Sequence, residues 1–152
     1  MLVLDTNVVL DLLHFDDATA RPLLDALEAG RVRCVVTDAT QEEWRRVLAY
    51  PEFGLDAARQ AALVARYQAL AIGADSVAVG NPTDCGLKPV WTPMPRCSDP
   101  DDQKFLELAA AACAQGLVSK DRALLKLRRR CAPQFRIMTP AEAVRWLGTP
   151  PA

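Results

Sequence analysis

Short apolar runs alternate along this chain with longer stretches in which apolar residues recur at helical spacing. The runs predict buried strands at 2–4, 34–36, 117–119 and 135–138. The stretches between them predict helices over 6–13, 21–28, 38–48, 56–70, 101–115, 121–127 and 139–148. Strands that alternate with helices are typical of an α/β fold, with a mostly parallel sheet that is covered on both faces.

One segment interrupts the alternation. Residues 73–100 hold five of the eleven prolines, and within them only 76–79 could form a strand. We interpret this segment as a surface excursion from the fold. The sequence therefore predicts a single domain over residues 1–148, with the 73–100 excursion inside it and a tail at 149–152.

Composition narrows the class of protein. The chain has 152 residues, of which 51% are hydrophobic and 24% charged, which is ordinary for a soluble domain with one core. Asp5 and Asp11 break the apolar N-terminal run, so we expect a cytoplasmic protein with no signal peptide and no membrane span. The net charge is −1, so a nucleic-acid partner would need a local basic patch. Five cysteines without a CxxC pair indicate reduced thiols.

Four acidic residues occupy related places in the predicted fold. Asp5 ends the first strand, and Asp121 closely follows the third. Asp102 begins the helix that leads into the third strand, and Glu43 lies in the helix after the second. Because the carboxyl ends of parallel strands meet at one edge, these side chains can converge. Converging carboxylates need a cation, and an all-oxygen set without His or Cys selects Mg²⁺ or Mn²⁺.

Each acid also has a plainer interpretation. Asp5 and Asp121 could cap helices or form turns, Asp102 lies where acids favour the helix dipole, and Glu43 could be a surface residue. Strand-terminal aspartates also occur in phosphoaspartate receivers and small phosphatases. A receiver would need such an aspartate near the middle of the chain with a later lysine, and here the signals lie near the two ends.

The combination of motifs resembles the PIN-domain nucleases, and more narrowly the PIN-family toxin components of bacterial toxin–antitoxin systems. The matching stretches are LVLDTNVVLDLL, VTDATQEEWRRVLAYPEF, IMTPAEAVRWL and, as the most specific, PRCSDPDDQKFLELAAAACAQGLVSKDRALL. The resemblance covers nearly the whole chain in the same order. It implies a three-layer α/β/α sandwich around a short, mostly parallel central sheet.

The resemblance also implies roles for particular residues. Those implied to be catalytic and to bind Mg²⁺ or Mn²⁺ are Asp5, Glu43, Asp102 and Asp121, and those implied to support the site are Asn7, Ser119 and Asp99. One departure is Ser119-Lys120-Asp121, where the family more often has Thr-Gly-Asp, so that Lys120 adds bulk and charge near the cleft. The implied activity is hydrolysis of single-stranded RNA by the toxin of a type II pair. The alternative is a non-catalytic PIN-like module that binds RNA or protein.

Partners follow from the same resemblance. RNA phosphates would meet basic residues beside the acids in sequence, although these residues could equally balance nearby acidic charge: Arg45, Arg46, Lys104, Lys120 and Arg122. The run Arg128-Arg129-Arg130 either matches a helix dipole or contacts phosphate. A small antitoxin and a second copy of the chain are the expected protein partners. The stripe of Leu23, Leu24 and Leu27 could form the dimer interface or belong to the core.

Overall fold

The central feature of the computed structural model, which describes residues 1–74, 95–132 and 134–148, is a parallel sheet of five short strands. The strand order across the sheet is β3-β2-β1-β4-β5, and every neighbouring pair is parallel. The first strand of the chain is therefore the central one. The strands are β1 (Leu2–Leu4), β2 (Cys34–Val36), β3 (Ala71–Gly73), β4 (Gly116–Val118) and β5 (Arg136–Met138).

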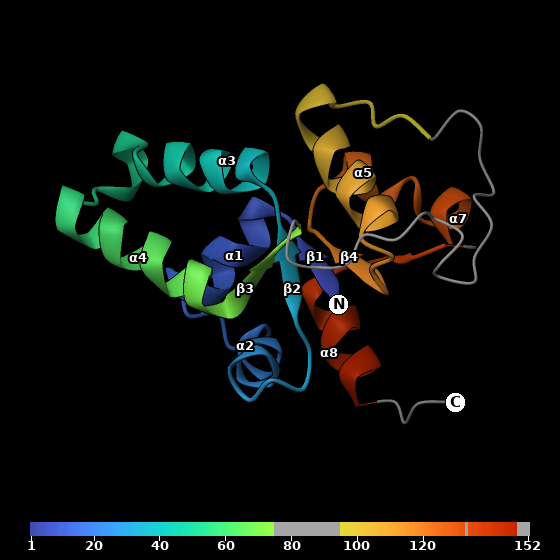
Figure 1. Cartoon of the computed structure of the whole chain (residues 1–152), viewed down its shortest axis with the longest axis horizontal. Coiled ribbons are helices and arrows are strands. Elements are labelled where there is room, and N and C mark those ends of the chain that lie inside the picture. The colour runs from blue at the N-terminus through green and yellow to red at the C-terminus, as the bar shows by residue number, and fades with distance from the viewer. Residues whose placement is uncertain (75–94, 133, 149–152) are drawn as a thin grey trace.

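Helices cover both faces of this sheet, which confirms the predicted α/β/α sandwich (Figure 1). They are α1 (Thr6–Leu13), α2 (Arg21–Glu28), α3 (Asp38–Leu48), α4 (Ala57–Leu70), α5 (Gln103–Ala111), α6 (Arg122–Leu125), α7 (Arg128–Cys131) and α8 (Pro140–Leu147), with 3₁₀ turns at Pro51–Phe53 and Pro100–Asp102. In Figure 1, α3 and α4 lie to the left of the sheet and α5 and α7 to the right.

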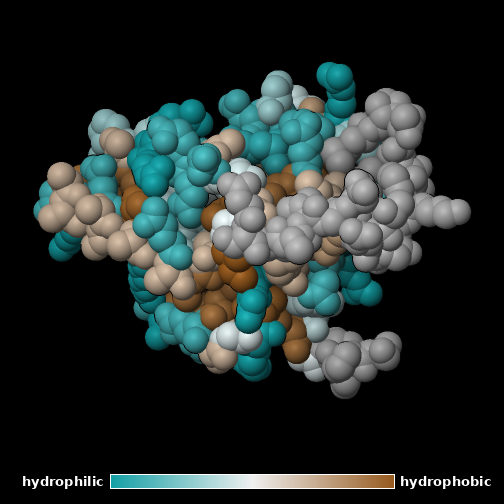
Figure 2. Space-filling model, viewed as in Figure 1, coloured by the Kyte–Doolittle hydropathy of each residue, from teal (hydrophilic) through white to brown (hydrophobic). Residues whose placement is uncertain are grey.

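The alternation of strand side chains divides the core in two. Leu2 and Leu4 of β1 pack with α1, α2, α3 and α8, whereas Val3 between them packs with α5, α6 and α7. Strand β4 repeats this pattern, because Val118 packs on the same face of the sheet as Leu2 and Leu4, and Leu117 packs on the face of Val3. Figure 2 shows hydrophilic residues over the outer surface of α3 and hydrophobic residues toward the middle of the molecule.

Polar residues at the helix starts fix where the helices begin. Thr37 and Thr139 accept hydrogen bonds from the third amide of α3 and α8, and the side chains of Thr40 and Glu142 bond back to the capping residues' amides. Asp56 accepts the amide of Arg59 and caps α4. These caps hold α3 and α8 in place just after the strands that precede them.

Several boundaries differ from the prediction. β3 at Ala71–Gly73 was missed, because its three residues directly continue the helical pattern of α4. The helix predicted over 121–127 is shorter, because α6 ends at Leu125, and a separate short helix, α7, follows it at Arg128–Cys131. The helix predicted over 101–115 is α5, which runs only from Gln103 to Ala111 and follows a 3₁₀ turn at Pro100–Asp102. The possible strand at 76–79, most of the 73–100 excursion and the 149–152 tail lie outside the described residues.

The structure also decides two expectations, one about the leucine stripe of α2 and one about the cysteines. Leu23, Leu24 and Leu27 are buried in the core of the single chain, so they do not form an exposed stripe for a second copy. Cysteines 34, 97 and 131 are free and buried, but Cys113 is disulfide-bonded, which corrects the expectation of reduced thiols at that position. None of the helices in the described ranges is long and apolar enough to cross a membrane.

Candidate metal centre

Three aspartates meet at the carboxyl edge of the two central strands. Asp5 follows β1, Asp121 follows β4, and Asp102 ends the 3₁₀ turn from which α5 begins. Helix α5 packs against both β1 and β4, which brings Asp102 to the same edge. One carboxylate oxygen from each aspartate lies within 4.8 Å of the other two. The topology thus assembles a compact set of oxygen ligands from residues up to 116 positions apart in sequence.

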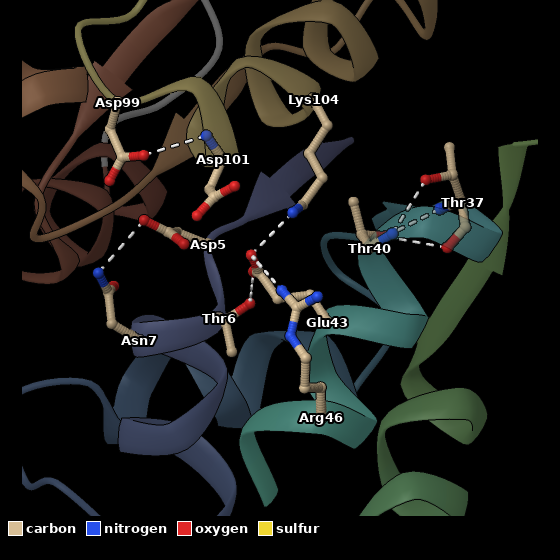
Figure 3. A network of polar contacts seen from close by, with 10 residues as sticks. All are labelled: Asp5, Thr6, Asn7, Thr37, Thr40, Glu43, Arg46, Asp99, Asp101 and Lys104. Atoms are coloured by element: carbon tan, nitrogen blue, oxygen red, sulfur yellow. Dashed lines mark hydrogen bonds and ion pairs between the residues drawn. The ribbon is translucent and has the colours of Figure 1, made fainter. Parts of the chain in front are cut away.

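Asp5 is turned into the cluster instead of capping the helix that it precedes. It stands at the N-cap position of α1 but makes no side-chain cap hydrogen bond there. Its Oδ2 accepts hydrogen bonds from Ser119 Oγ at 2.6 Å and from Asn7 Nδ2 at 3.2 Å (Figure 3 shows Asn7 beside Asp5). The side chain is buried, so these donors hold its carboxylate in one orientation.

Ser119 and Asn7 also connect Asp5 to the loop that carries Asp121. Ser119 Oγ accepts the amide of Asp121 at 2.9 Å, and Asn7 Oδ1 accepts the amide of Lys120 at 3.4 Å. Each of these two side chains therefore contacts both Asp5 and the loop that carries Asp121. The supporting roles expected of Asn7 and Ser119 stay a prediction.

Asp102 and Asp121 differ in how their oxygens are satisfied. Asp121 Oδ1 accepts the amide of Ala123 at 2.8 Å, so this residue is both a helix cap and a member of the cluster. Asp102 is buried, and its Oδ2 has no hydrogen-bond partner within the described part of the chain. A buried carboxylate oxygen without a donor is costly unless a proton or a cation satisfies it.

Burial and mutual repulsion raise the proton affinity of the cluster. Burial raises the pKa of Asp5 from 3.8 to about 6, although the hydrogen bond from Ser119 acts in the opposite direction. Burial is also the largest cause at Asp102, followed by a hydrogen bond shared with Asp121 and by the charges of Asp5, Asp121 and Asp99, and together they raise its pKa to about 8. The arrangement is one that a divalent cation would stabilise.

Glu43 lies near this cluster but outside the group of oxygens within 4.8 Å. Its charge disfavours ionisation of Asp5, which indicates proximity. Its carboxylate accepts a hydrogen bond from the Thr6 hydroxyl and forms an ion pair with Lys104 Nζ at 2.7 Å (Figure 3). Arg46 lies 3.9 Å from the same carboxylate. The negative charge of Glu43 is therefore already balanced within the chain.

The other residues expected at the rim are mostly engaged with acids. Arg45 pairs with Glu42 at 3.6 Å, and Lys120 pairs with buried Asp11 at 2.7 Å. Arg122 is exposed and forms no ion pair with any described residue. Among these five cations, it alone presents an uncompensated charge.

Asp99 fits both of its interpretations. Its Oδ1 accepts the amide of Asp101 at 3.0 Å and so caps the 3₁₀ turn. Its charge also reaches Asp102 and raises the pKa of that residue. Asp99 thus positions the segment that delivers Asp102 and adds to the negative potential of the cluster.

Two residues that the sequence did not single out for this site contribute to it. Thr6 was interpreted only as a helix cap, yet its hydroxyl binds Glu43. Asp11 was noted only because it interrupts an apolar run, yet it holds Lys120 beside the loop of Asp121. An acid at a core-facing helical position was the one available signal for Asp11.

The donor set fits a hard divalent cation. All three clustered ligands are carboxylates, and neither His nor free Cys joins them in the described residues. A family model described as a PIN domain matches residues 1–123, a range that contains Asp5, Glu43, Asp102 and Asp121. No curated protein and no solved structure matches the chain significantly.

Proposed function

The chain belongs to the PIN-domain family, whose members are generally metal-dependent nucleases, and from this premise we propose that it is an endoribonuclease that uses Mg²⁺ or Mn²⁺ to hydrolyse single-stranded RNA. The observation that carries the proposal is the buried Oδ2 of Asp102, which has no donor among the described residues and belongs to a cluster of three carboxylates. The cluster needs positive charge, and a bound metal ion would supply it.

The proposed ligands are Asp5, Asp102 and Asp121, with Glu43 as the fourth acid of the centre. When bound, the ion would supply electrostatic stabilisation of a phosphodiester under attack and would lower the pKa of a coordinated water. Ser119 and Asn7 hold the carboxylate of Asp5 in place, so the ligand set is preorganised. Lys104 and Thr6 fix Glu43 at the border of the cluster.

For substrate capture we propose the exposed Arg122 first, since its charge is not compensated. Arg45, Arg46, Lys104 and Lys120 would add phosphate contacts only by leaving the acids that they now bind. The metal-free centre is negative and repels a polyanion, so RNA contacts next to the three aspartates become stronger when the ion is bound.

We further propose that the protein acts in the cytoplasm as the toxin of a type II toxin–antitoxin pair. The support is the resemblance of residues 95–125 to that group of PIN proteins. A small antitoxin would bind the chain. We expect the chain to form a single domain over residues 1–148 and to associate as a homodimer. Induced expression should arrest growth, and co-expression of an adjacent small gene should restore it. Light scattering at micromolar concentration tests the dimer.

Turnover of end-labelled single-stranded RNA in the presence of Mn²⁺ tests the proposed activity. Asp5→Asn should abolish cleavage, because it removes a charged ligand from the cluster. Asp25→Asn is the matched control, since Asp25 is exposed on α2 away from the sheet edge, and it should cleave like the wild type. Metal and RNA binding without turnover in the wild type would contradict the enzyme and favour the non-catalytic module.

A further inference from the structure

A basic cavity of about 460 Å³ opens beside β5, the edge strand of the sheet, between α7 and α8. Four arginines line it, namely Arg128, Arg129, Arg136 and Arg145, and Glu142 is the one acid among its described lining residues. We call this cavity the β5 groove. Its lining carries a local excess of positive charge, although the net charge of the chain is −1. Such a patch attracts an anionic partner.

The charge of the β5 groove is only partly used within the protein. Arg128 binds Glu142 through two hydrogen bonds, at 2.8 and 3.3 Å, and this pair is neutral overall. Arg129 and Arg136 are exposed and form no ion pair with described residues. This differs from the metal centre, where four of the five predicted rim cations are tied to carboxylates. The groove therefore carries two exposed arginines whose charge no described acid balances.

The floor of the groove is apolar. Ile137 and Met138 of β5 are buried, and Trp146 of α8 is partly buried against the same core as Met138. Arginines around an apolar and aromatic wall are the combination that binds single-stranded nucleic acid, because phosphates meet the cations and bases meet the apolar surface. The volume lies in the range of pockets that take small ligands.

The groove is close to the metal centre along the sheet. The carbonyl oxygen of Met138 accepts the amide of Ser119 at 2.9 Å, and the hydroxyl of Ser119 binds Asp5. β5 is separated from β1 by β4 alone, so the two strands lie about 10 Å apart. An RNA strand that leaves the centre at the end of β1 can therefore reach the groove within a few nucleotides.

We propose that the β5 groove binds a segment of the single-stranded RNA substrate beyond the scissile phosphate. Phosphates contact Arg129 and Arg136, and a base packs against the partly buried Trp146. This inference rests on the proposed ribonuclease function, and it means that the bound RNA runs from the metal centre to the β5 groove. An acidic peptide that extends the sheet at β5 is less well supported, since this edge has only three residues and offers few backbone groups for pairing.

The test compares two double variants with the same change in charge. Arg129→Ala/Arg136→Ala removes the free cations of the groove, and the control Arg31→Ala/Arg59→Ala removes two exposed arginines elsewhere. Affinity for a labelled RNA of about twelve nucleotides is measured without divalent ions over a range of salt concentrations. The groove variant should lower the slope of log affinity against log salt by about 1.4 and weaken binding about 25-fold near 0.1 M salt, since each phosphate contact contributes about 0.7 to the slope.

The control variant should bind RNA like the wild type, and equal losses in the two variants would overturn the proposal. The binding assay measures affinity and not cleavage, so it gives a result even if the metal centre is inactive. Failure of the ribonuclease function and failure of the groove are therefore distinguishable. Crosslinking of 4-thiouridine RNA to the wild type needs no variant and should label the segment 136–148. Labels confined to α3 and α4, or a Glu-rich peptide that occupies the groove without displacing RNA, would overturn it.

Discussion

The hydroxyl of Ser119 donates a 2.6 Å hydrogen bond to Asp5 across a separation of 114 residues in sequence. The same hydroxyl accepts the amide of Asp121 at 2.9 Å. One buried side chain thus links the carboxyl ends of β1 and β4, the two strands from which the metal cluster projects. The precise orientation of Asp5 depends on this link more than on its own helix, to which its side chain gives no cap.

Ser119→Ala should weaken metal binding. The substitution removes a donor that lowers the pKa of Asp5, so a proton competes more strongly with the ion for this carboxylate. We expect Mn²⁺ affinity to fall about 10–100-fold by calorimetry near neutral pH, as for other residues that orient a ligand. Thr19→Ala removes an exposed hydroxyl from the connection between α1 and α2 and should have no effect. Equal affinities for Ser119→Ala and the wild type would refute the link.

The metal-free protein should lose stability as pH rises. The folded pKa values of Asp5 and Asp102, about 6 and about 8, lie above the usual 3.8, so the folded state binds these protons more tightly than the unfolded state. Their stabilising contribution is complete below about pH 4 and is lost as pH rises to about 8. Asp102→Asn mimics the protonated form, so its melting temperature should exceed that of the wild type increasingly between about pH 5 and about pH 8.

The comparison is made by thermal melts in the presence of a chelator, and added Mn²⁺ should raise the melting temperature of the wild type more than that of Asp102→Asn. A difference between the two proteins that stays constant with pH would show that Asp102 does not titrate in this range. A wild type that Mn²⁺ does not stabilise would argue against the metal centre itself.

Lys104→Met should increase metal affinity. Lys104 neutralises Glu43 through a 2.7 Å ion pair, and its removal leaves that carboxylate with only the longer 3.9 Å contact to exposed Arg46 beside the cluster. We expect a several-fold gain in Mn²⁺ affinity and a lower melting temperature without metal, because the added repulsion is relieved only by the ion. Lys126→Met changes an exposed lysine at the C-terminal end of α6, which forms no ion pair with a described residue, as the control. A loss of metal affinity in Lys104→Met would mean that the ion pair itself organises the site.

Gly116→Ala should destabilise the sheet. A Cβ at this position would lie 2.6 Å from Met138 Cε, 3.2 Å from Leu2 Cδ2 and 3.2 Å from the Arg136 carbonyl oxygen. The side chains can shift but the backbone oxygen cannot do so freely, so we expect a loss of about 1–3 kcal/mol in urea unfolding. Gly73→Ala, in β3, meets nothing within 4 Å and is the matched control. Similar losses in the two variants would show that packing at β4 is not the cause.

The fold could be predicted because its strands and helices have strong local signals. Runs such as Leu2–Leu4 and Cys34–Val36 are uniformly apolar, as buried parallel strands require, and their helices begin at polar capping residues. β3 could not be found in this way, since Ala71–Gly73 is short, only half-buried and continuous with the pattern of α4. Its assignment as a strand comes from pairing with β2, which is a tertiary contact.

The positions of the clustered aspartates could be predicted from the sequence, but the partners of the basic residues beside them could not. Strand-end placement brings Asp5 and Asp121 together whatever surrounds them, and the family motif adds Asp102. The basic residues beside them in sequence were expected to face RNA, but side-chain direction decides their partners, and Lys104 and Lys120 turn to Glu43 and Asp11. Spacing along the chain does not contain that information. The run that includes Arg129 was named as a possible phosphate contact, but only the fold places it beside Arg136 in the β5 groove.

The order of the strands also constrains when the protein can become active during its synthesis. β1 is made first but lies at the centre of the sheet, and its neighbour β4 comes more than 110 residues later. The carboxylates of Asp5 and Asp121 cannot meet until the segment that contains both residues has left the ribosome. Such distant pairing makes folding slow compared with local helix formation. A nascent copy that has not yet released Asp121 would therefore lack the metal cluster, and under the proposed function it could not cleave the RNA around it.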